Sequence, residues 1–286
     1  FYQYNQYINR ENLRQSGTGY ADIVKGLEEV IDSFSVQAFL TGGNGANTWS
    51  LPSDYYLINK VFHYPTLLTS GTTTSSNTNQ LINTTLIGQP SPPRFDTGVT
   101  GFTVFPQTGS LVVNTDTLTE SFVNSVVSTV TLDLATDIFT SSVVPFVGEN
   151  YSIFDANTIV EVERVSQNKL FYLTSSTLTA PSNLFPAFVL DGNIITVYPT
   201  SIQAAGAIKT QYIRYPKPPK WTFVSIVEGE PLFDASAADY QDFELPLSDE
   251  PGLIAKICQY VGIEIREPEV YNFGSTEEVQ ENQIQV

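Results

Sequence analysis

The stretch FVLDGNIITVYP, residues 188–199, places two apolar runs on either side of an Asp191-Gly192 pair. Glycine adopts positive φ at little steric cost, and Asp-Gly is among the commonest pairs in tight hairpin turns. The flanking β-branched and aromatic residues suit a pleated, half-buried surface. The stretch therefore predicts an antiparallel β-hairpin, and it indicates the character of the middle of the chain.

The same composition recurs on both sides of this hairpin. Short runs rich in Val, Thr and aromatic residues, separated by Gly, Pro, Asn and Asp, are typical of antiparallel sheets. They predict strands within residues 55–62, 102–106, 110–118, 125–134, 141–148, 157–165, 169–175 and 207–216. The polar tract SGTTTSSNTNQLINTT, residues 70–85, is interpreted as a loop or projecting finger, whose Thr residues suit a surface hairpin.

Helices are expected at the two ends. Near the N-terminus, an apolar stripe with spacings of three and four predicts a helix between an Asp22 cap and the Gly42-Gly43 pair, with Ile23, Leu27, Val30, Ile31, Phe34 and Ala38 on one side. Near the C-terminus, Ser248 or Asp249 can cap a helix with Pro251 in its first turn and a stripe of Ile254, Ile257, Cys258, Val261 and Ile265. Pro268 ends that pattern, so the following residues predict an extended arm.

Together these patterns predict an α+β, mainly β fold. Its body is an antiparallel β-sandwich or barrel, with an N-terminal helix, an inserted β-rich domain, and a C-terminal helix followed by the extended arm. The expected divisions are residues 1–66 for the helical segment and first strand, 67–150 for the Thr/Val-rich insertion, 151–246 for the β body, and 247–286 for the C-terminal helix and arm.

The charge is strongly acidic. Thirty Asp and Glu residues face thirteen Lys and Arg, a formal net charge of −17, which disfavours sequence-specific nucleic-acid binding. No basic residue lies between Arg94 and Arg164, or between Lys220 and Lys256. Two interpretations stay open: the acidity maintains solubility, or it forms a surface to which DNA does not adhere.

The sequence offers no catalytic, cofactor-binding or metal-binding set. The single histidine, His63, has no partner in sequence, and the single cysteine, Cys258, lies on an apolar helix stripe typical of a buried residue. Nucleophile-elbow, zinc, EF-hand and phosphate-loop patterns are absent from the sequence, and Asp234, Asp239 and Asp242 indicate a solvated loop. Without a long apolar run or a signal-peptide core, we expect a soluble protein that does not cross a membrane.

Two segments are candidates for contacts between subunits. The strip YIRYPKPPKW, residues 212–221, is held extended by prolines and carries the densest basic cluster, Arg214, Lys217 and Lys220, next to Trp221. It suits docking against carboxylates of another subunit. The C-terminal arm supplies the second set: Arg266, Val270, Tyr271 and Phe273.

The order of three segments resembles structural proteins of crAss-like tailed bacteriophages. The segments are LPSDYYLINKV at 51–61, the stretch from GNIITVYPTSI to YIRYPKPPKW at 192–221, and FELPLSDEPGLIAKICQYVGIEIREPEVYNF at 243–273, followed by a Gln/Glu-rich tail. More distantly, this order is similar to the adaptor or tail-tubular proteins of short-tailed phages. Residues 70–150 match no part of that resemblance.

The resemblance implies a structural role in the virion. Such proteins form rings, often twelvefold, under the portal in the head-to-tail conduit, and they have no catalytic residues. The expected partners are further copies of the chain, the portal, and other ring or tail proteins. Genomic DNA passes through the channel without specific binding, and assembly takes place in the host cytoplasm. Two alternatives remain: a glycan-binding or receptor-binding β module of a phage tail or adhesin, and, more remotely, a glycoside hydrolase using two carboxylates.

Overall fold

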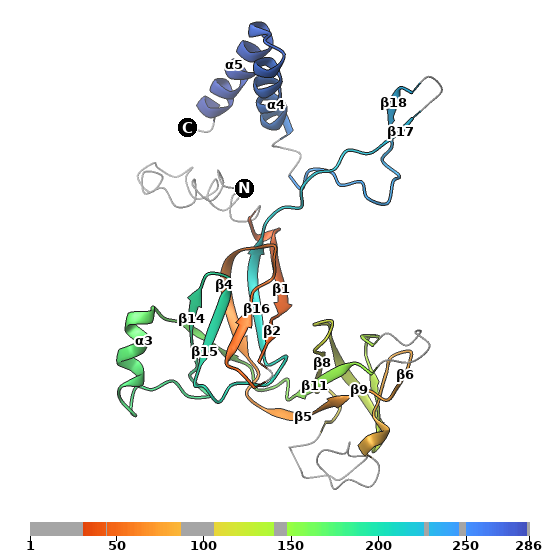
Figure 1. The fold of residues 1–286 in the computed structure, drawn as a ribbon, viewed down its shortest axis with the longest axis vertical. Coiled ribbons are helices and arrows are strands. Elements are labelled where there is room, and N and C mark those ends of the chain that lie inside the picture. The colour runs from red at the N-terminus through yellow and green to blue at the C-terminus, as the bar shows by residue number, and fades with distance from the viewer. Residues whose placement is uncertain are drawn as a thin grey trace. The chain divides into compact units, whose positions relative to one another are not determined.

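The computed structural model describes residues 31–43, 45–86, 106–139, 148–225, 229–245 and 250–284 (Figure 1). The chain divides into two compact units, one of residues 35–214 and one of residues 1–34 together with 215–286. These limits differ from the divisions expected at 66, 150 and 246. Strands predominate, nearly all neighbouring strands are antiparallel, and the predicted fold class, α+β and mainly β, is confirmed.

The first unit contains two sheets that form its body. One has the order β1 (Ser35–Phe39), β16 (Ile208–Arg214), β4 (Tyr55–His63) and β12 (Val160–Glu161). The other has the order β13 (Glu163–Arg164), β14 (Ala187–Asp191), β15 (Ile194–Tyr198), β3 (Thr48–Ser50) and β2 (Thr41–Gly42). Only the β13–β14 pair is parallel among these strands.

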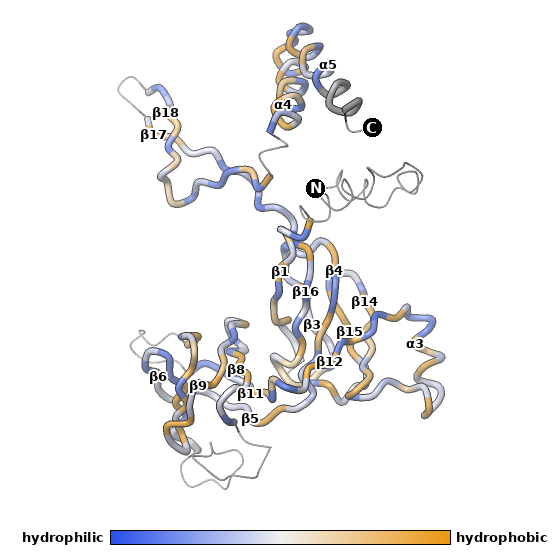
Figure 2. The backbone as a smooth tube through the Cα atoms, turned by 180° about the vertical axis from the view of Figure 1, so that it is seen from behind, coloured by the Kyte–Doolittle hydropathy of each residue, from blue (hydrophilic) through white to orange (hydrophobic). Residues whose placement is uncertain are grey.

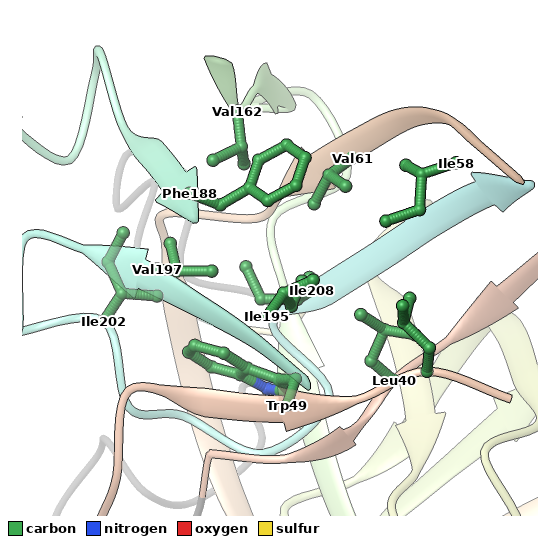
Figure 3. Close-up of a cluster of buried hydrophobic side chains, with 11 residues drawn as sticks. Leu40, Trp49, Ile58, Val61, Val162, Phe188, Ile195, Val197, Ile202 and Ile208 are labelled. Atoms are coloured by element: carbon green, nitrogen blue, oxygen red, sulfur yellow. The ribbon is translucent and has the colours of Figure 1, made fainter. Parts of the chain in front are cut away.

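A hydrophobic core lies between the inner faces of these two sheets (Figure 3). Trp49 and Ile195 come from the five-stranded sheet, while Val61 and Ile208 come from the four-stranded sheet, and all four are almost fully buried. Successive residues of a strand point to opposite faces, so every second residue contributes to this core. Side chains from strands far apart in sequence therefore hold the body together.

The β14–β15 hairpin confirms the prediction made from residues 188–199. Asp191 pairs with Ile194, which leaves Gly192 and Asn193 as the two-residue loop. Gly192 has φ of 58°, the left-handed conformation that glycine adopts with little strain. The turn is thus centred one residue later than the Asp191-Gly192 pair suggested.

A third sheet, in the same unit, curls around a core of its own. Its order is β5 (Leu67–Thr72), β11 (Asn150–Phe154), β8 (Leu111–Asn114), β9 (Glu120–Ser128), β10 (Thr131–Leu134), β7 (Gln80–Ile82) and β6 (Ser75–Asn77). Leu68 of β5 and Leu81 of β7 belong to one buried cluster with residues of the strands between them, which requires the sheet to curl. A short 3-10 helix, η2 (Thr84–Leu86), follows β7.

The interpretation of residues 70–85 as a loop or projecting finger is wrong, whereas the hairpin considered for this tract is present as β6 and β7. This tract supplies the end of β5 and the β6–β7 hairpin, with Asn79 at φ of 58° in the turn. Its Thr and Ser residues pair with neighbouring strands, and the buried Leu81 anchors it to the core. Strands in this tract are marked by β-branched Thr rather than by apolar alternation.

The seven-stranded sheet is joined to the body through a small aromatic cluster. The ring of Tyr64 lies 6.0 Å from the rings of Phe39 and Phe154. At this joint Lys209 of β16 forms an ion pair with Glu120 of β9, with a 2.7 Å separation between Nζ and Oε1. Lys209 is mostly buried, and its Nζ also lies 5.3 Å from the centre of the Phe39 ring. The contact combines apolar packing with a partly desolvated charge pair.

The strand expected at residues 169–175 is wrong, because this segment forms α3 (Gln167–Thr174). Ser166 has extended backbone angles, and its side chain accepts a hydrogen bond from the backbone N–H of Lys169, as a helix cap does. Leu170 and the half-buried Leu173, three residues apart, pack onto Ala187 and Val189 of β14. The aromatic residues Phe171 and Tyr172 suggest a strand, although the spacing of Leu170 and Leu173 is helical.

The N-terminal helix was expected to run through Ala38, and its last part is wrong. Residues 35–39 form β1, which pairs with Lys209–Ile213 of β16. Backbone hydrogen bonds from this tertiary pairing outweigh the local helical spacing. The expected helical residues 22–30 lie outside the described residues.

The second unit includes a two-stranded sheet and two helices. The strands are β17 (Phe223–Ser225) and β18 (Pro231–Phe233), and the helices are α4 (Glu250–Glu264) and α5 (Pro268–Ile284). The predicted C-terminal helix is present as α4. The extended arm is wrong, because the residues after Pro268 form α5. Proline is well accommodated in the first turn of a helix; α4 already ends at Glu264, and Pro268 is the first residue of α5.

We expect the core between the two body sheets to dominate the stability of the first unit. Replacing Ile195 by Ala removes a fully buried side chain and should lower the free energy of unfolding by about 2–4 kcal/mol. Denaturant unfolding followed by the fluorescence of Trp49, which is buried, measures this loss. Ile194→Ala, on the opposite face of the same strand, is the matched control and should cost less than about 1 kcal/mol. Equal losses in the two variants would contradict the packing of β15.

Candidate functional site

The C-terminal helices form a closed hairpin. Arg266 adopts φ of 58°, the backbone N–H of Glu267 donates to the Gly262 carbonyl at 2.9 Å, and that of Arg266 donates to the Ile263 carbonyl at 3.3 Å. This pair of hydrogen bonds is the Schellman arrangement that ends helices, with Arg266 in the position usually held by glycine. Arg266, predicted to contact another subunit, thus also reverses the chain direction between α4 and α5.

Small residues bring the two helices into close contact. A Cβ atom on Gly262 would lie 2.6 Å from the backbone N of Tyr271, and one on Gly274 would lie 2.5 Å from the carbonyl O of Ala255. Ala255, Gly262 and Gly274 are buried, so the helix–helix contact is made largely of backbone. Large side chains cannot enter a contact this close.

Consequently, the large apolar residues of α4 lie on its outer surfaces. The stripe Ile254, Ile257 and Val261 follows the predicted spacing, but each of these residues remains exposed, as do Tyr260 and Ile263 on the other side. Tyr260 is the most exposed, at 73%. In Figure 2 apolar residues recur along the whole of α4.

A helix that is apolar around most of its circumference is typical of a buried helix. Within the described part of the chain, none of the helices has the length and apolar character needed to cross a bilayer. Because the large apolar residues of α4 are exposed, the surface of the hairpin is a candidate site for contact with protein.

The three other predicted arm residues lie on α5. Tyr271 packs its backbone and Cβ against Gly262 and leaves part of its ring exposed. Phe273 is exposed, and Val270 is half-buried. The prediction that this segment carries exposed aromatic residues identified the right side chains, but they are presented by a helix.

The basic strip is extended, as its prolines suggested, but its polar groups meet carboxylates of the same chain. Arg214 is the last residue of β16. The backbone N–H of Lys217 donates to Glu244 Oε2 at 2.8 Å, and Lys220 Nζ forms an exposed ion pair with Asp239. Exposed pairs of this kind contribute little to stability, so they are easily exchanged for other contacts.

An exposed aromatic stack extends from this strip. Trp221, 57% exposed, stacks on Phe223 with 5.2 Å between ring centres, and the Phe233 ring lies 6.4 Å from it. Phe223 and Phe233 are opposite each other in the β17–β18 pair. On the other face of that pair, Val224 and Leu232 are also opposite each other and exposed. We call residues 215–225 and 229–245 the ribbon.

Sequence reasoning missed a further apolar surface. α3 buries Leu170 but exposes Phe171 and Tyr172, and the loop after it exposes Leu178, Leu184 and Phe185. We call residues 164–186 the α3 segment. Its sequence, NKLFYLTSSTLTAPSNLF at 168–185, is rich in apolar residues and poor in charge, which was the available signal; the strand interpretation concealed it.

The acidic loop residues are held by donors of their own chain. Asp234 accepts hydrogen bonds from the hydroxyl and backbone of Ser236, which lower the pKa of its carboxyl. Lys220 likewise lowers the pKa of Asp239, and Asp242 accepts from the backbone N–H of Phe243. Among the described residues, no three His, Cys, Asp or Glu side chains form a group that could hold a metal ion.

His63 lies in the interior of the body rather than at a surface cleft. It is buried on β4, and its Nδ1 has no hydrogen-bond partner among the described residues. Burial lowers the pKa of His63 from 6.5 to about 4, while a hydrogen bond with the backbone of Asn183 opposes this shift. The imidazole is therefore neutral at physiological pH. Cys258 is a half-buried free thiol on α4.

Comparison with known proteins provides no relative. No family model, curated protein or solved structure matches the chain. The functional argument therefore depends on the surfaces described above and on the sequence resemblance.

The close contact of α4 and α5 should not tolerate a side chain at Gly274. Gly274→Ala gains about 1 kcal/mol in helix propensity, but its Cβ would collide with a backbone carbonyl of α4, and overpacking costs about 1–3 kcal/mol. We expect faster amide hydrogen exchange throughout α4 and α5. Ser275→Ala, one residue along the same helix, is the control and should leave exchange unchanged. Unchanged or slower exchange in Gly274→Ala would show that the helices do not depend on this contact.

His63 should make the body less stable in mild acid. The unfolded histidine takes up a proton near its ordinary pKa of 6.5, whereas the folded one does so only near pH 4. Between these values the unfolded chain binds more protons, so stability falls as the pH decreases, by about 2 kcal/mol between about pH 7.5 and 5. Denaturant unfolding of the wild type and His63→Gln measures this contribution as the difference between the two pH dependences. Parallel pH dependences would contradict a buried, neutral His63.

Proposed function

We propose that this chain is a non-catalytic structural subunit of a tailed-phage virion. It forms a homo-oligomeric ring under the portal, in the head-to-tail conduit through which the genome passes. The single observation that carries the proposal is the α4–α5 hairpin, whose glycine contact turns the large apolar side chains of α4 outward.

The energetic argument concerns exposed apolar area. Removing apolar surface from water contributes about 25 cal/mol per Å², and fully burying one Ile or Val side chain contributes about 1.5–3 kcal/mol. Ile254, Ile257, Val261 and Ile263 each keep about half of their surface exposed in the isolated chain. Burial of this surface by a neighbouring copy provides a strong drive for assembly, because the apolar residues are presented on a preformed helix.

The proposed role also gives a use to the acidic charge. With a net charge of −17, the chain repels the phosphates of DNA, so a conduit lined with such subunits lets the genome slide without adhesion. Three carboxylates of the ribbon, Asp234, Asp239 and Asp242, accept a hydrogen bond or form an ion pair within the ribbon. In this proposal solubility and low DNA affinity come from the same residues.

Family resemblance supplies the remaining detail of the proposal. The order of the segments at 51–61, 192–221 and 243–273 resembles crAss-like phage structural proteins, for which twelvefold rings are expected. The partners would be the portal and other ring or tail proteins, with assembly in the host cytoplasm and no role for a membrane.

One observation favours a second function. Trp221, Phe223 and Phe233 form a group of stacked, exposed aromatic rings, and an exposed aromatic ring suits stacking against a sugar ring. A glycan-binding module with this surface would act as a monomer or trimer. A measurement of the oligomeric state therefore distinguishes a glycan-binding module from a ring subunit.

The hairpin surface should be required for assembly. We expect native mass spectrometry and electron microscopy of the purified chain to show closed rings, and the double variant Ile257→Glu, Val261→Glu to remain at the monomer mass of 31.5 kDa. Adding two charges to the apolar contact prevents its burial, while the far-UV circular dichroism should not change. The control, Asn272→Glu with Thr276→Glu, adds the same charges to exposed polar positions of α5 and should still form rings. A wild type that is monomeric or trimeric and binds glycans would replace the ring with the second function.

A further inference from the structure

The large apolar side chains of the α3 segment are mostly exposed to solvent. Leu170 is buried on β14, which fixes α3 with Phe171 and Tyr172 directed away from the body. In the loop that follows, Leu178 is 93% exposed and Phe185 is 80% exposed. The loop is nevertheless ordered by hydrogen bonds, because Thr179 Oγ1 donates to the Leu173 carbonyl at 3.1 Å and Ser182 pairs with Phe185. Apolar side chains held exposed by an ordered backbone indicate a contact surface.

The charge of this segment is unlike that of the rest of the chain. No Asp or Glu lies between Arg164 and Leu190, although the chain as a whole has a net charge of −17. The two basic residues of the segment are Arg164 and Lys169, and both are exposed. Lys169 forms an exposed ion pair with Glu163 at 3.2 Å, which solvent largely screens. The segment is therefore an apolar surface with a basic edge.

The ribbon has the opposite charge and the same apolar character. Residues 215–245 contain two lysines and six carboxylates. Both faces of the β17–β18 pair carry exposed apolar side chains, Phe223 with Phe233 on one face and Val224 with Leu232 on the other. A two-stranded sheet alone is only marginally stable in water, so this element requires a surface that covers one of its faces.

We propose that the ribbon of one copy of this chain docks on the α3 segment of a second copy. This inference rests on the proposed ring function and identifies two surfaces that join successive subunits. The apolar faces supply the buried area, and the acidic ribbon meets the basic edge of the α3 segment, where Arg164 and Lys169 are exposed. Contact between two ribbons would place like charges together, which opposes a symmetric arrangement.

The consequence is a heterologous contact. Because the two surfaces are different, a docked pair of copies retains one unoccupied ribbon and one unoccupied α3 segment. Repetition of such a contact produces a ring when the rotation closes, whereas a contact between identical surfaces stops at a dimer. The proposal therefore specifies direction in the assembly as well as the residues involved.

Mixing two assembly-deficient variants tests this arrangement. One variant carries Leu178→Asp and Phe185→Asp, and the other carries Val224→Asp and Leu232→Asp. Alone, each should lose the ring, because one of the two surfaces that form the ribbon–α3 contact between successive copies is mutated. In a mixture, the intact ribbon of the first variant can dock on the intact α3 segment of the second, while the other ends cannot join.

Native mass spectrometry should then show a 1:1 complex at twice the monomer mass of 31.5 kDa, and no closed ring. The control variant, Phe122→Asp with Val127→Asp, removes two exposed apolar side chains of β9 and should assemble like the wild type. Failure of the two variants to form the 1:1 complex overturns the proposal, as does an unchanged ring in either variant alone.

A disulfide crosslink provides direct proof of the contact. In a Cys258→Ser background, one copy carries Leu178→Cys and another carries Leu232→Cys. Oxidation of the mixture should give the 178–232 dimer in excess of either homodimer. Homodimers alone would indicate a symmetric contact and overturn the proposal.

The outcomes separate this inference from the proposed function. If rings form but the 178–232 crosslink does not, the proposed ring function stands and the contact between the ribbon and the α3 segment is wrong. The crosslink and 1:1 complex without closed rings retain the contact and reject the ring. A wild-type chain that remains monomeric at all concentrations, with its ribbon covered by its own α3 segment, rejects both.

Discussion

The close approach of α4 and α5 is the constraint on which the functional argument depends. Two helices packed through Gly262, Gly274 and Ala255 have no room between them for Ile or Tyr side chains. In most helical pairs the large apolar residues fill the contact and polar residues face water, which completes the hairpin as a unit. Here the small residues form the contact, and the large apolar residues of α4 lie outside it. The two helices are closely packed, but the large apolar side chains of α4 remain exposed to solvent.

Elsewhere in the described chain, well-buried cores occur together with segments whose apolar side chains are exposed. In residues 35–214, core residues such as Ile195 and Val61 lie on one face of their strands, and each of the two body sheets directs that face toward a shared core. The seven-stranded sheet curls, and this buries one of its faces around a core that includes Leu81 and Ile153. The ribbon and the α3 segment lack such an arrangement, because their apolar side chains lie on elements too small to enclose them. Among the described residues, most of the exposed large apolar side chains belong to the ribbon, the α3 segment and the α4–α5 hairpin.

Sequence patterns predicted the fold best where the local and tertiary preferences agree. Asp191-Gly192 between two apolar runs predicts a hairpin because the turn and both strands favour the same register. Residues 35–39 carry a helical spacing, but pairing with β16 decides their structure, and no local pattern contains that partner. For α3, the decisive signals are a single serine cap and two leucines that contact β14, which are weaker than the aromatic composition that suggested a strand.

The prediction of an extended arm shows a different limit. α4 ends before Pro268, as predicted, but proline also begins helices, and its sequence position cannot distinguish the two roles. The distinction depends on whether the chain can reverse at Arg266 and whether the next helix can approach the first. Both conditions depend on small residues, Gly262 and Gly274, whose significance appears only when the two helices are placed together. The exposed residues of the predicted interface were thus identifiable from sequence, whereas their presentation on a rigid hairpin required the structure. A rigid hairpin loses less conformational entropy on binding than a free arm does, so in the proposed ring the same side chains would provide a stronger contact.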